Sequence, residues 1–193
     1  TALVAGLIGT TLGVLAGYFG GRVDAVVSYV ITCRLAMPVV LVALAMASLV
    51  GGSLKVVIVL LSLLLWDRFA IVTRSATQQL RDAEFIAAAK SLGASTPYIL
   101  VRELLPNLMG ALTVVATLEM AHAILLESTL SFLGLGVQPP TPSWGLMVAE
   151  GKAYMFFQPW VIMIPGVVLA VLVLAINLVG DGIRDVAAPD GRH

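Results

Sequence analysis

The chain has 193 residues, of which 11 are basic, 11 are acidic and 60% are hydrophobic, and its formal net charge is zero. Charged residues make up 11% of the chain, against about 25% in ordinary soluble domains, which is too few to cover a soluble surface. This composition predicts a lipid-embedded protein and excludes a disordered chain, a coiled coil and a disulfide scaffold. The zero net charge gives no field to attract nucleic acid, and the single Cys33 allows no internal disulfide and no zinc cluster.

Five apolar segments are long enough to cross a bilayer as helices, because a span needs about 20 apolar residues. They are residues 1–20, 28–50, 54–77, 106–134 and 159–181. Lipid offers the backbone no hydrogen bonds and no segment alternates like a barrel strand, so we expect one all-α transmembrane domain over residues 1–193. Thr1 opens directly inside an apolar run with no basic leader, so we expect the beginning of the chain to be missing from this sequence.

Basic residues predict the orientation in the membrane. If five spans alternate, seven basic residues fall on one side, and only Lys55 and Lys152 fall on the other. The seven are Arg22, Arg74, Arg81, Lys90, Arg102, Arg184 and Arg192. The excess places a loop at about residues 78–106 and the C-terminus in the cytoplasm, and a loop at about 135–158 outside. Trp144 and Trp160 then lie near the outer interface, where indole rings are enriched.

The sequence of the cytoplasmic loop predicts two consecutive short helices. Residues 81–93 are rich in alanine, and Gly93 is a suitable C-terminal stop. A second helix should begin at residues 95–97, with Thr96 as the cap and Pro97 in the first turn, and Pro106 marks the junction with the next span. Helices this short and rich in small residues indicate either a surface that docks a partner or a loop that lies on the lipid interface.

The same loop carries a known pattern. Residues 84–93, Glu-Phe-Ile-Ala-Ala-Ala-Lys-Ser-Leu-Gly, followed by Leu-Leu-Pro-Asn at 104–107, resemble the cytoplasmic EAA loop of ABC importer permeases. In that family Glu-Ala-Ala is followed by three residues, Gly, nine residues and Ile-x-Leu-Pro. Ala88, Ala89, Gly93, Leu105 and Pro106 match at this spacing, and Glu84, three residues before the pattern, matches the family's usual Glu-Phe/Tyr-Val/Ile lead-in. Ala87 stands where the family usually has Glu, and Glu103 stands where it often has Ile. The resemblance implies that this loop, Ala87 included, couples the chain to an ATPase subunit.

Three further stretches, residues 15–21, 130–145 and 177–185, resemble the dipeptide/oligopeptide/nickel permeases, and the second (C-type) permease subunit most. The resemblance implies the type I ABC importer permease fold (binding-protein-dependent transport, MetI-like), which usually has six spans, so one N-terminal span is absent here. It also implies a permease subunit of an ATP-driven importer of dipeptides, oligopeptides or related small solutes, in a bacterial or archaeal plasma (inner) membrane. The implied partners are a second permease subunit, two ATP-binding subunits and an extracytoplasmic substrate-binding protein.

The sequence contains no phosphate-binding loop of the form GxxxxGK[ST]. Its one Gly-Lys pair, Gly151-Lys152, has Leu146 in place of the first glycine and Ala153 in place of Ser or Thr. We therefore expect that the chain is not an enzyme and binds no cofactor itself, with ATP and Mg²⁺ held by partner subunits.

Three ionisable residues fall inside the fourth apolar segment, where they are costly and usually face a cavity or a partner. Glu119 and His122 share one helix face, and Glu127 lies about 80° around the helix from Glu119. We favour a polar pair buried against the partner permease, and the alternative is a lining of the translocation path. A metal site is disfavoured, because a Glu-x-x-His di-iron bundle needs a second copy, and His193 is the only other histidine. A proton-coupled secondary transporter, with these three residues as its relay, is the alternative function.

The outer loop holds a second candidate surface. Residues 138–142, Gln-Pro-Pro-Thr-Pro, cannot be helical, and Ser143 can cap a helix that carries Trp144, Met147 and Val148 on one face. This helix either rests on the bilayer or forms a gate surface beneath the binding protein.

Two features of the apolar segments concern packing. Gly6, Gly9, Gly13 and Gly17 recur at spacings that let another helix approach closely. Arg34 interrupts the second segment, where we expect it to snorkel to the interface or to pair with Asp24 or with an acidic neighbour.

Overall fold

The computed structural model describes the backbone of residues 1–187 and the side chains of residues 1–183. The described residues form helices and turns and contain no strand, which confirms the all-α prediction. The side chains of Arg184 and Arg192, used above to predict the orientation, lie outside the described residues.

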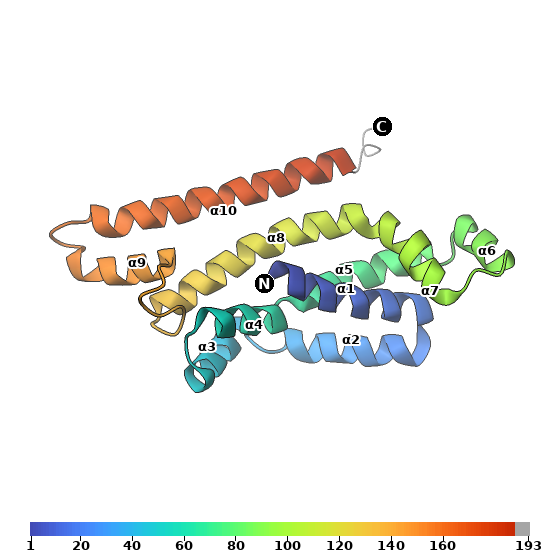
Figure 1. Cartoon of the computed structure of the whole chain (residues 1–193), viewed down its shortest axis with the longest axis horizontal. Helices are drawn as coiled ribbons and strands as arrows, with labels where there is room; N and C mark the ends of the chain where they lie inside the picture. The colour runs from blue at the N-terminus through green and yellow to red at the C-terminus, as the bar shows by residue number, and fades with distance from the viewer. Residues whose placement is uncertain (188–193) are drawn as a thin grey trace. The chain divides into compact units, whose positions relative to one another are not determined.

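Most helices follow one another along the chain with short connections, and a longer loop over residues 133–143 joins α8 to α9 (Figure 1). They are α1 (Ala2–Phe19), α2 (Gly21–Leu35), α3 (Val39–Val50), α4 (Leu54–Leu64), α5 (Trp66–Leu80), α6 (Glu84–Ser91), α7 (Thr96–Tyr98), the π-helical turn η1 (Ile99–Leu104), α8 (Leu105–Phe132), α9 (Trp144–Gly151), the 3₁₀ turn η2 (Lys152–Tyr154) and α10 (Trp160–Ala187). The chain divides into two compact units. The first holds residues 1–2, 37–65 and 117–179, and the second holds residues 3–36, 66–116 and the chain from residue 180 onwards.

Four helical segments of the described chain are long and apolar enough to cross a membrane, and the broken pair α2–α3 makes a fifth if it counts as one span. The four are Ala2–Phe19, Leu54–Leu80, Thr96–Phe132 and Trp160–Ile183. The predicted continuous span over residues 28–50 is wrong. The helix begins earlier, at Gly21, and stops at Leu35, and α3 starts after Pro38. The break follows from Pro38, which disfavours helical backbone in the residue before it and has no N–H to continue the ladder.

The direction of α1 relative to α5 sets the number of crossings. Gly9 lies against Trp66 and Ala70, and Gly17 lies against Arg74 and Thr77, so the two helices run in the same direction. Two parallel spans must be separated by an odd number of crossings. The pair α2–α3 therefore fits one broken span, which gives five candidate spans among the described residues, in agreement with the number that the sequence predicts.

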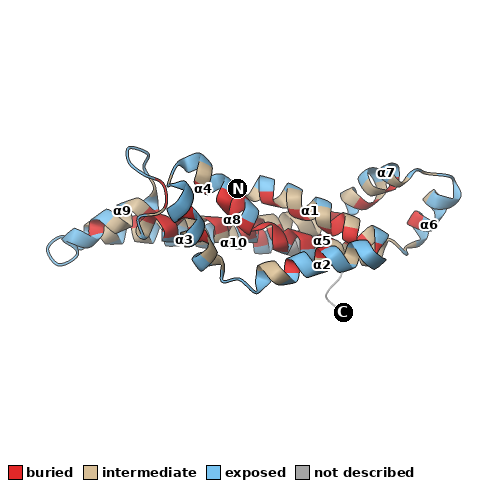
Figure 2. Ribbon diagram, turned by 90° about the horizontal axis from the view of Figure 1, so that it is seen from below, coloured by how far each residue is buried: buried red, intermediate tan, exposed pale blue. Residues whose placement is uncertain are grey.

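Backbone contact holds α1 on α5. A Cβ added to Gly9 would collide with the carbonyl oxygen of Trp66, and one added to Gly13 would collide with the carbonyl oxygen of Ala70. A Cβ on Gly17 would lie 2.7 Å from the carbonyl oxygen of Arg74. The predicted role of these glycines is confirmed, because nothing larger than hydrogen fits between the two helices. Buried positions accordingly mark both α1 and α5, shown in red in Figure 2.

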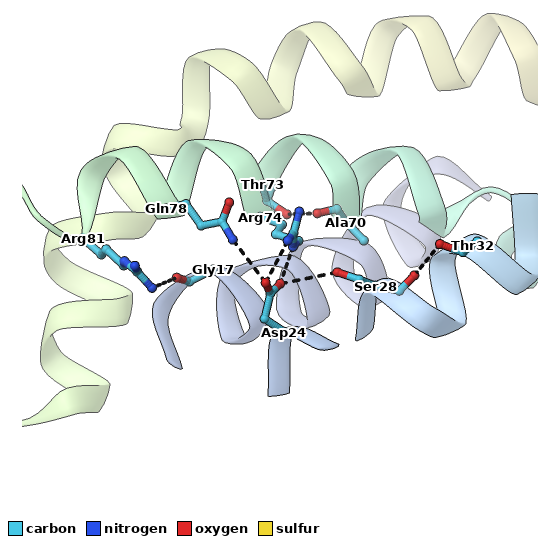
Figure 3. A network of polar contacts seen from close by, with 9 residues as sticks. All are labelled: Gly17, Asp24, Ser28, Thr32, Ala70, Thr73, Arg74, Gln78 and Arg81. Atoms are coloured by element: carbon cyan, nitrogen blue, oxygen red, sulfur yellow. Dashed lines mark hydrogen bonds and ion pairs between the residues drawn. The ribbon is translucent and has the colours of Figure 1, made fainter. Parts of the chain in front are cut away.

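A polar network ties α2 to α5 (Figure 3). The Arg74 guanidinium donates from Nε and Nη2 to the two carboxylate oxygens of Asp24, and the Nη2–Oδ2 distance is 2.8 Å. Gln78 Nε2 lies 3.5 Å from the same carboxylate, and Arg81 Nη1 donates to the carbonyl oxygen of Gly17 at 3.3 Å. The sequence offered Arg34 as a partner of Asp24, but packing supplies Arg74, 50 positions away along the chain.

Candidate functional site

A small hydrophobic core fixes the loop between α5 and α8. Ile86 of α6 is buried together with Ile99 and Leu104 of the η1 turn, each at most 1% exposed, and Tyr18 and Leu80 pack beside them. This core packs one face of α6 against the turn, and Phe85, Ala87 and Ala88 on the rest of the helix are exposed. The two predicted helices therefore form one compact hairpin, within the second unit.

Gly93 ends α6 as the sequence predicts. Its backbone has φ +81°, in the left-handed region that glycine adopts without strain. Gly93 N–H bonds the carbonyl oxygen of Lys90 and Ala94 N–H bonds that of Ala89, both at 3.0 Å. These are the two bonds of a Schellman motif, which satisfies the last carbonyls of a helix while turning the chain sharply.

The second predicted helix differs from expectation, because it runs into the next span without a break. Thr96–Phe132 is one helical segment, although residues 99–104 within it take the wider π form. Pro106 has no N–H to give to the preceding turn, so the helix there adjusts its bonding, and the Leu105 N–H reaches back to the carbonyl oxygen of Leu100. Asn107 Nδ2 donates to the carbonyl oxygen of Glu103 at 2.6 Å. Pro106 therefore marks the start of α8 rather than a gap between two helices.

The predicted coupling residues divide into two groups. Glu84, Ala87 and Ala88 lie exposed on α6, Ala89 is half-buried on the same helix, and Gly93 is exposed at its end. Leu105 is half-buried and Pro106 is exposed, both at the start of α8. The residue that joins the groups is Leu104, which sequence reasoning did not single out and which packs, fully buried, in the core with Ile86. The sequence does hold a signal for Leu104, because this leucine lies inside the matched pattern, between Glu103 and Leu105.

Large side chains stand out from this hairpin toward solvent. Leu92 is 88% exposed, and Tyr98 and Phe85 are also exposed. We call Phe85, Leu92 and Tyr98, with the exposed residues of α6, the loop surface. The loop surface includes the charged residues Glu84 and Lys90, and the Lys90 ammonium lies 5.4 Å from the ring centre of Tyr18. Several exposed large apolar side chains rimmed by charges, rather than one alone, are a feature of protein contact sites.

A hollow of about 350 Å³ opens beside the loop surface. Its walls are Ala89, Leu92, Gly93, Ala94, Ser95, Tyr98 and Glu103. Small residues form most of the wall, so the hollow can admit a side chain from another protein.

The ionisable residues of α8 are brought together only in part. His122 Nδ1 lies 3.5 Å from Oε2 of Glu119, whose side chain is almost fully buried, so the predicted pair exists. Glu127 does not join it, because its Oε1 accepts a 2.6 Å hydrogen bond from Ser131 Oγ, which in turn accepts from Val137 N–H. Glu127 thereby anchors the turn that follows α8. Within the described residues, no three His, Cys, Asp or Glu side chains come together as a metal site would require.

Helix α9 forms as predicted, with Ser143 Oγ accepting from Leu146 N–H at 3.1 Å. Trp144 and Met147 are exposed and Val148 is half-buried. Gly145 and Gly151, to which sequence reasoning gave no packing role, hold this helix in place. A Cβ on Gly145 would lie 2.5 Å from the carbonyl oxygen of Ser128 in α8, and one on Gly151 would lie 3.0 Å from Ile162 in α10.

Comparison with known proteins places this architecture. A family model described as "Binding-protein-dependent transport system inner membrane component" matches residues 9–193. The dipeptide transport system permease protein DppC of Alkalihalophilus pseudofirmus is 37% identical over 95% of this chain and 60% of its own length. The glutathione transport system permease protein GsiD of Pectobacterium atrosepticum is 36% identical over 98% of this chain and 63% of its own length. The chain therefore spans about three fifths of the length of these relatives.

A solved structure shows the same fold. A chain of the MetNI methionine ABC transporter, in inward-facing conformations, superposes with a TM-score of 0.75 and 20% identity over 96% of this chain and 88% of that one. The predicted MetI-like permease fold is confirmed. From its match over most of its length, the chain belongs to the family of binding-protein-dependent transport system inner membrane components.

Proposed function

We propose that the chain is a permease subunit of an ATP-driven importer of dipeptides, oligopeptides or related small solutes. The observation that carries the proposal is the loop surface, in which a buried core holds a short helix pair with Leu92 projecting at 88% exposure. Such a surface suits docking of a cytoplasmic partner, and the names of the relatives, a dipeptide and a glutathione permease, support the substrate class.

The remaining parts of the importer are other chains. ATP-binding subunits would hold ATP and Mg²⁺, because this sequence has no phosphate-binding loop. A second permease subunit would supply the other half of the path, and a binding protein would deliver solute to the outer side near Trp144, Met147 and Val148 of α9. We place the loop surface and the C-terminus in the cytoplasm.

The mechanism follows from coupling between these parts. ATP binding would bring the two ATP-binding subunits together and move the docked α6 hairpins with them. The permease pair would then shift between two packings, one open inward and one open outward, because ATP favours only one of them. The partly exposed His122, with the buried Glu119 behind it, would lie against the second permease, and Glu127 stays a candidate for the path.

The test reconstitutes the permease in proteoliposomes with a second permease subunit, ATP-binding subunits and a binding protein from the same organism. Peptide uptake should require ATP, and the ATP-binding subunits should co-purify with the permease. Uptake that persists when ATP hydrolysis is blocked, or that follows a proton gradient with the permease alone, would overturn the proposal and favour a proton-coupled transporter.

A further inference from the structure

We propose that Glu103 supplies a carboxylate in the hollow beside the loop surface, and that this carboxylate binds a basic side chain, an arginine or a lysine, of the docked ATP-binding subunit. The inference rests on the proposed function and adds to it the chemistry of one contact. It also assigns a role to a residue that stands where the resembled pattern has an apolar one.

Glu103 is the one charged residue in the wall of this hollow. Its side chain is half-buried, and its carboxylate makes no hydrogen bond or ion pair with any other residue that the structure describes. A protein docked over the hollow would remove the remaining water from this carboxylate. Covering an ionised carboxylate without a partner is costly, so a tightly docked subunit must bring a cation to it.

The rest of the wall suits the long stem and flat head of a basic side chain. Leu92 offers an apolar edge for the methylene groups, and the half-exposed ring of Tyr98 can stack against a cation. The small residues Ala89 and Gly93 leave the room for it. An arginine satisfies all of these contacts at once, and a lysine satisfies the charge and the stem.

The π-helical turn explains why Tyr98 and Glu103 line the same hollow. In an α-helix, residues five apart point about 140° away from each other, at about 100° per residue. The η1 turn closes with bonds between residues five apart, which brings such residues to neighbouring positions on the helix. The local irregularity before Pro106 therefore places Tyr98 and Glu103 in the wall of one hollow.

The experiment measures docking with the permease as it exists in its assembly. The full-length permease and its second permease subunit are placed in nanodiscs, and purified ATP-binding subunit is titrated onto them at low and high salt. Glu103→Gln keeps the shape and removes the charge. Asp82→Asn removes an equal charge from the same loop outside the hollow, where Asp82 is exposed beside Arg81. We expect Glu103→Gln to weaken docking about tenfold or more at low salt and to reduce its salt dependence, and Asp82→Asn to change docking less than about twofold.

Two further variants make each outcome decisive. Glu103→Arg should dock still more weakly. Docking of this variant should be restored when the basic residue of the ATP-binding subunit that contacts position 103 is replaced with Glu. Glu103→Leu should dock as weakly as Glu103→Gln. Docking by Glu103→Gln that equals that of the unaltered permease at both salt concentrations would overturn the inference, and so would tighter docking by Glu103→Leu, which would indicate an apolar occupant. Failure of the unaltered permease to bind any ATP-binding subunit would instead overturn the proposed function itself.

Discussion

Arg74 of α5 binds Asp24 of α2 through both of its carboxylate oxygens, joining residues that lie 50 positions apart in the chain. Neither side chain is fully buried, since Arg74 is 31% exposed and Asp24 is 21% exposed. A two-point contact between planar groups fixes orientation as well as distance. Together with the backbone contact between α1 and α5, it makes α5 the helix on which α1 and α2 are assembled.

Removing Asp24 should therefore loosen α2. We expect Asp24→Ala and Arg74→Ala each to lower the free energy of unfolding by about 1–2 kcal/mol, at the lower end for a charged hydrogen bond because both groups are partly exposed. Thermal unfolding in detergent, followed by tryptophan fluorescence, measures this. The double variant should lose less than the sum of the single variants, and strictly additive losses would show that the two side chains do not interact.

The contact between α1 and α5 predicts a difference between two glycines. Gly9→Ala should destabilise the chain by about 1–3 kcal/mol, because its Cβ would enter the space of the Trp66 carbonyl oxygen and lie 2.6 Å from Phe69 Cβ. Gly166→Ala in α10 is the matched control, since nothing lies within 4 Å of the added atom. The free energy of unfolding of the control variant should rise slightly, by up to about 1 kcal/mol, because alanine has a higher helix propensity than glycine. Equal unfolding temperatures for the two variants would contradict the close approach.

The left-handed backbone at Gly93 predicts different effects on coupling for two substitutions of similar size. Asn tolerates the left-handed region, and the β-branched Val does not, so Gly93→Asn should retain coupling while Gly93→Val should lose most of it. The measurement is solute imported per ATP hydrolysed in proteoliposomes. Membrane insertion of both variants should stay normal, because α6 lies outside the spans. Unchanged coupling in Gly93→Val would count against the docking role of this hairpin.

Tryptophan fluorescence can place α9 and the start of α10 in the bilayer. In a Trp66→Phe background, the exposed Trp144 and Trp160 report on their surroundings. We expect lipids brominated close to the headgroup to quench them more strongly than lipids brominated near the chain ends, as the predicted outer interface requires. Stronger quenching by the deep bromines would place these residues inside the membrane and would change the assigned topology.

The two glutamates of α8 should behave differently. Glu119 is almost fully buried beside His122, so Glu119→Gln should lower the unfolding temperature without changing the KM for peptides. Glu127→Gln keeps an oxygen that can accept from Ser131, so the turn after α8 should survive. A KM shift in Glu119→Gln that is specific to peptides with a free amino group would place this carboxylate on the translocation path instead.

Local chemistry made several elements predictable. Ser143 begins α9 and Gly93 ends α6, as capping rules require, and the spans follow from runs of apolar residues. Apolar composition alone predicts one span over residues 28–50 and does not show the break before α3. The signal for this break is Pro38.

The pairing of Asp24 with Arg74 could not be read from the sequence, because it depends on which helix faces pack together. The same holds for the candidate site. The pattern at residues 84–106 located the loop, but the hollow and the position of Glu103 in its wall depend on the π-helical turn. Hydrogen bonding around a proline produces that turn, and side-chain periodicity carries no sign of it.

The contact between α1 and α5 restricts amino-acid substitutions in α1 more than in α5. Its atoms on α5 include the carbonyl oxygens of Trp66, Ala70 and Arg74, and every amino acid provides a carbonyl oxygen. Its atoms on α1 are the missing side chains of Gly9, Gly13 and Gly17, which no other residue can imitate. Natural variants of this chain should therefore keep glycine at these three positions, whereas α5 needs only side chains that fit the space now filled by Phe69, Thr73 and Thr77. Substitutions can thus alter side chains of α5 away from the contact without separating α5 from α1.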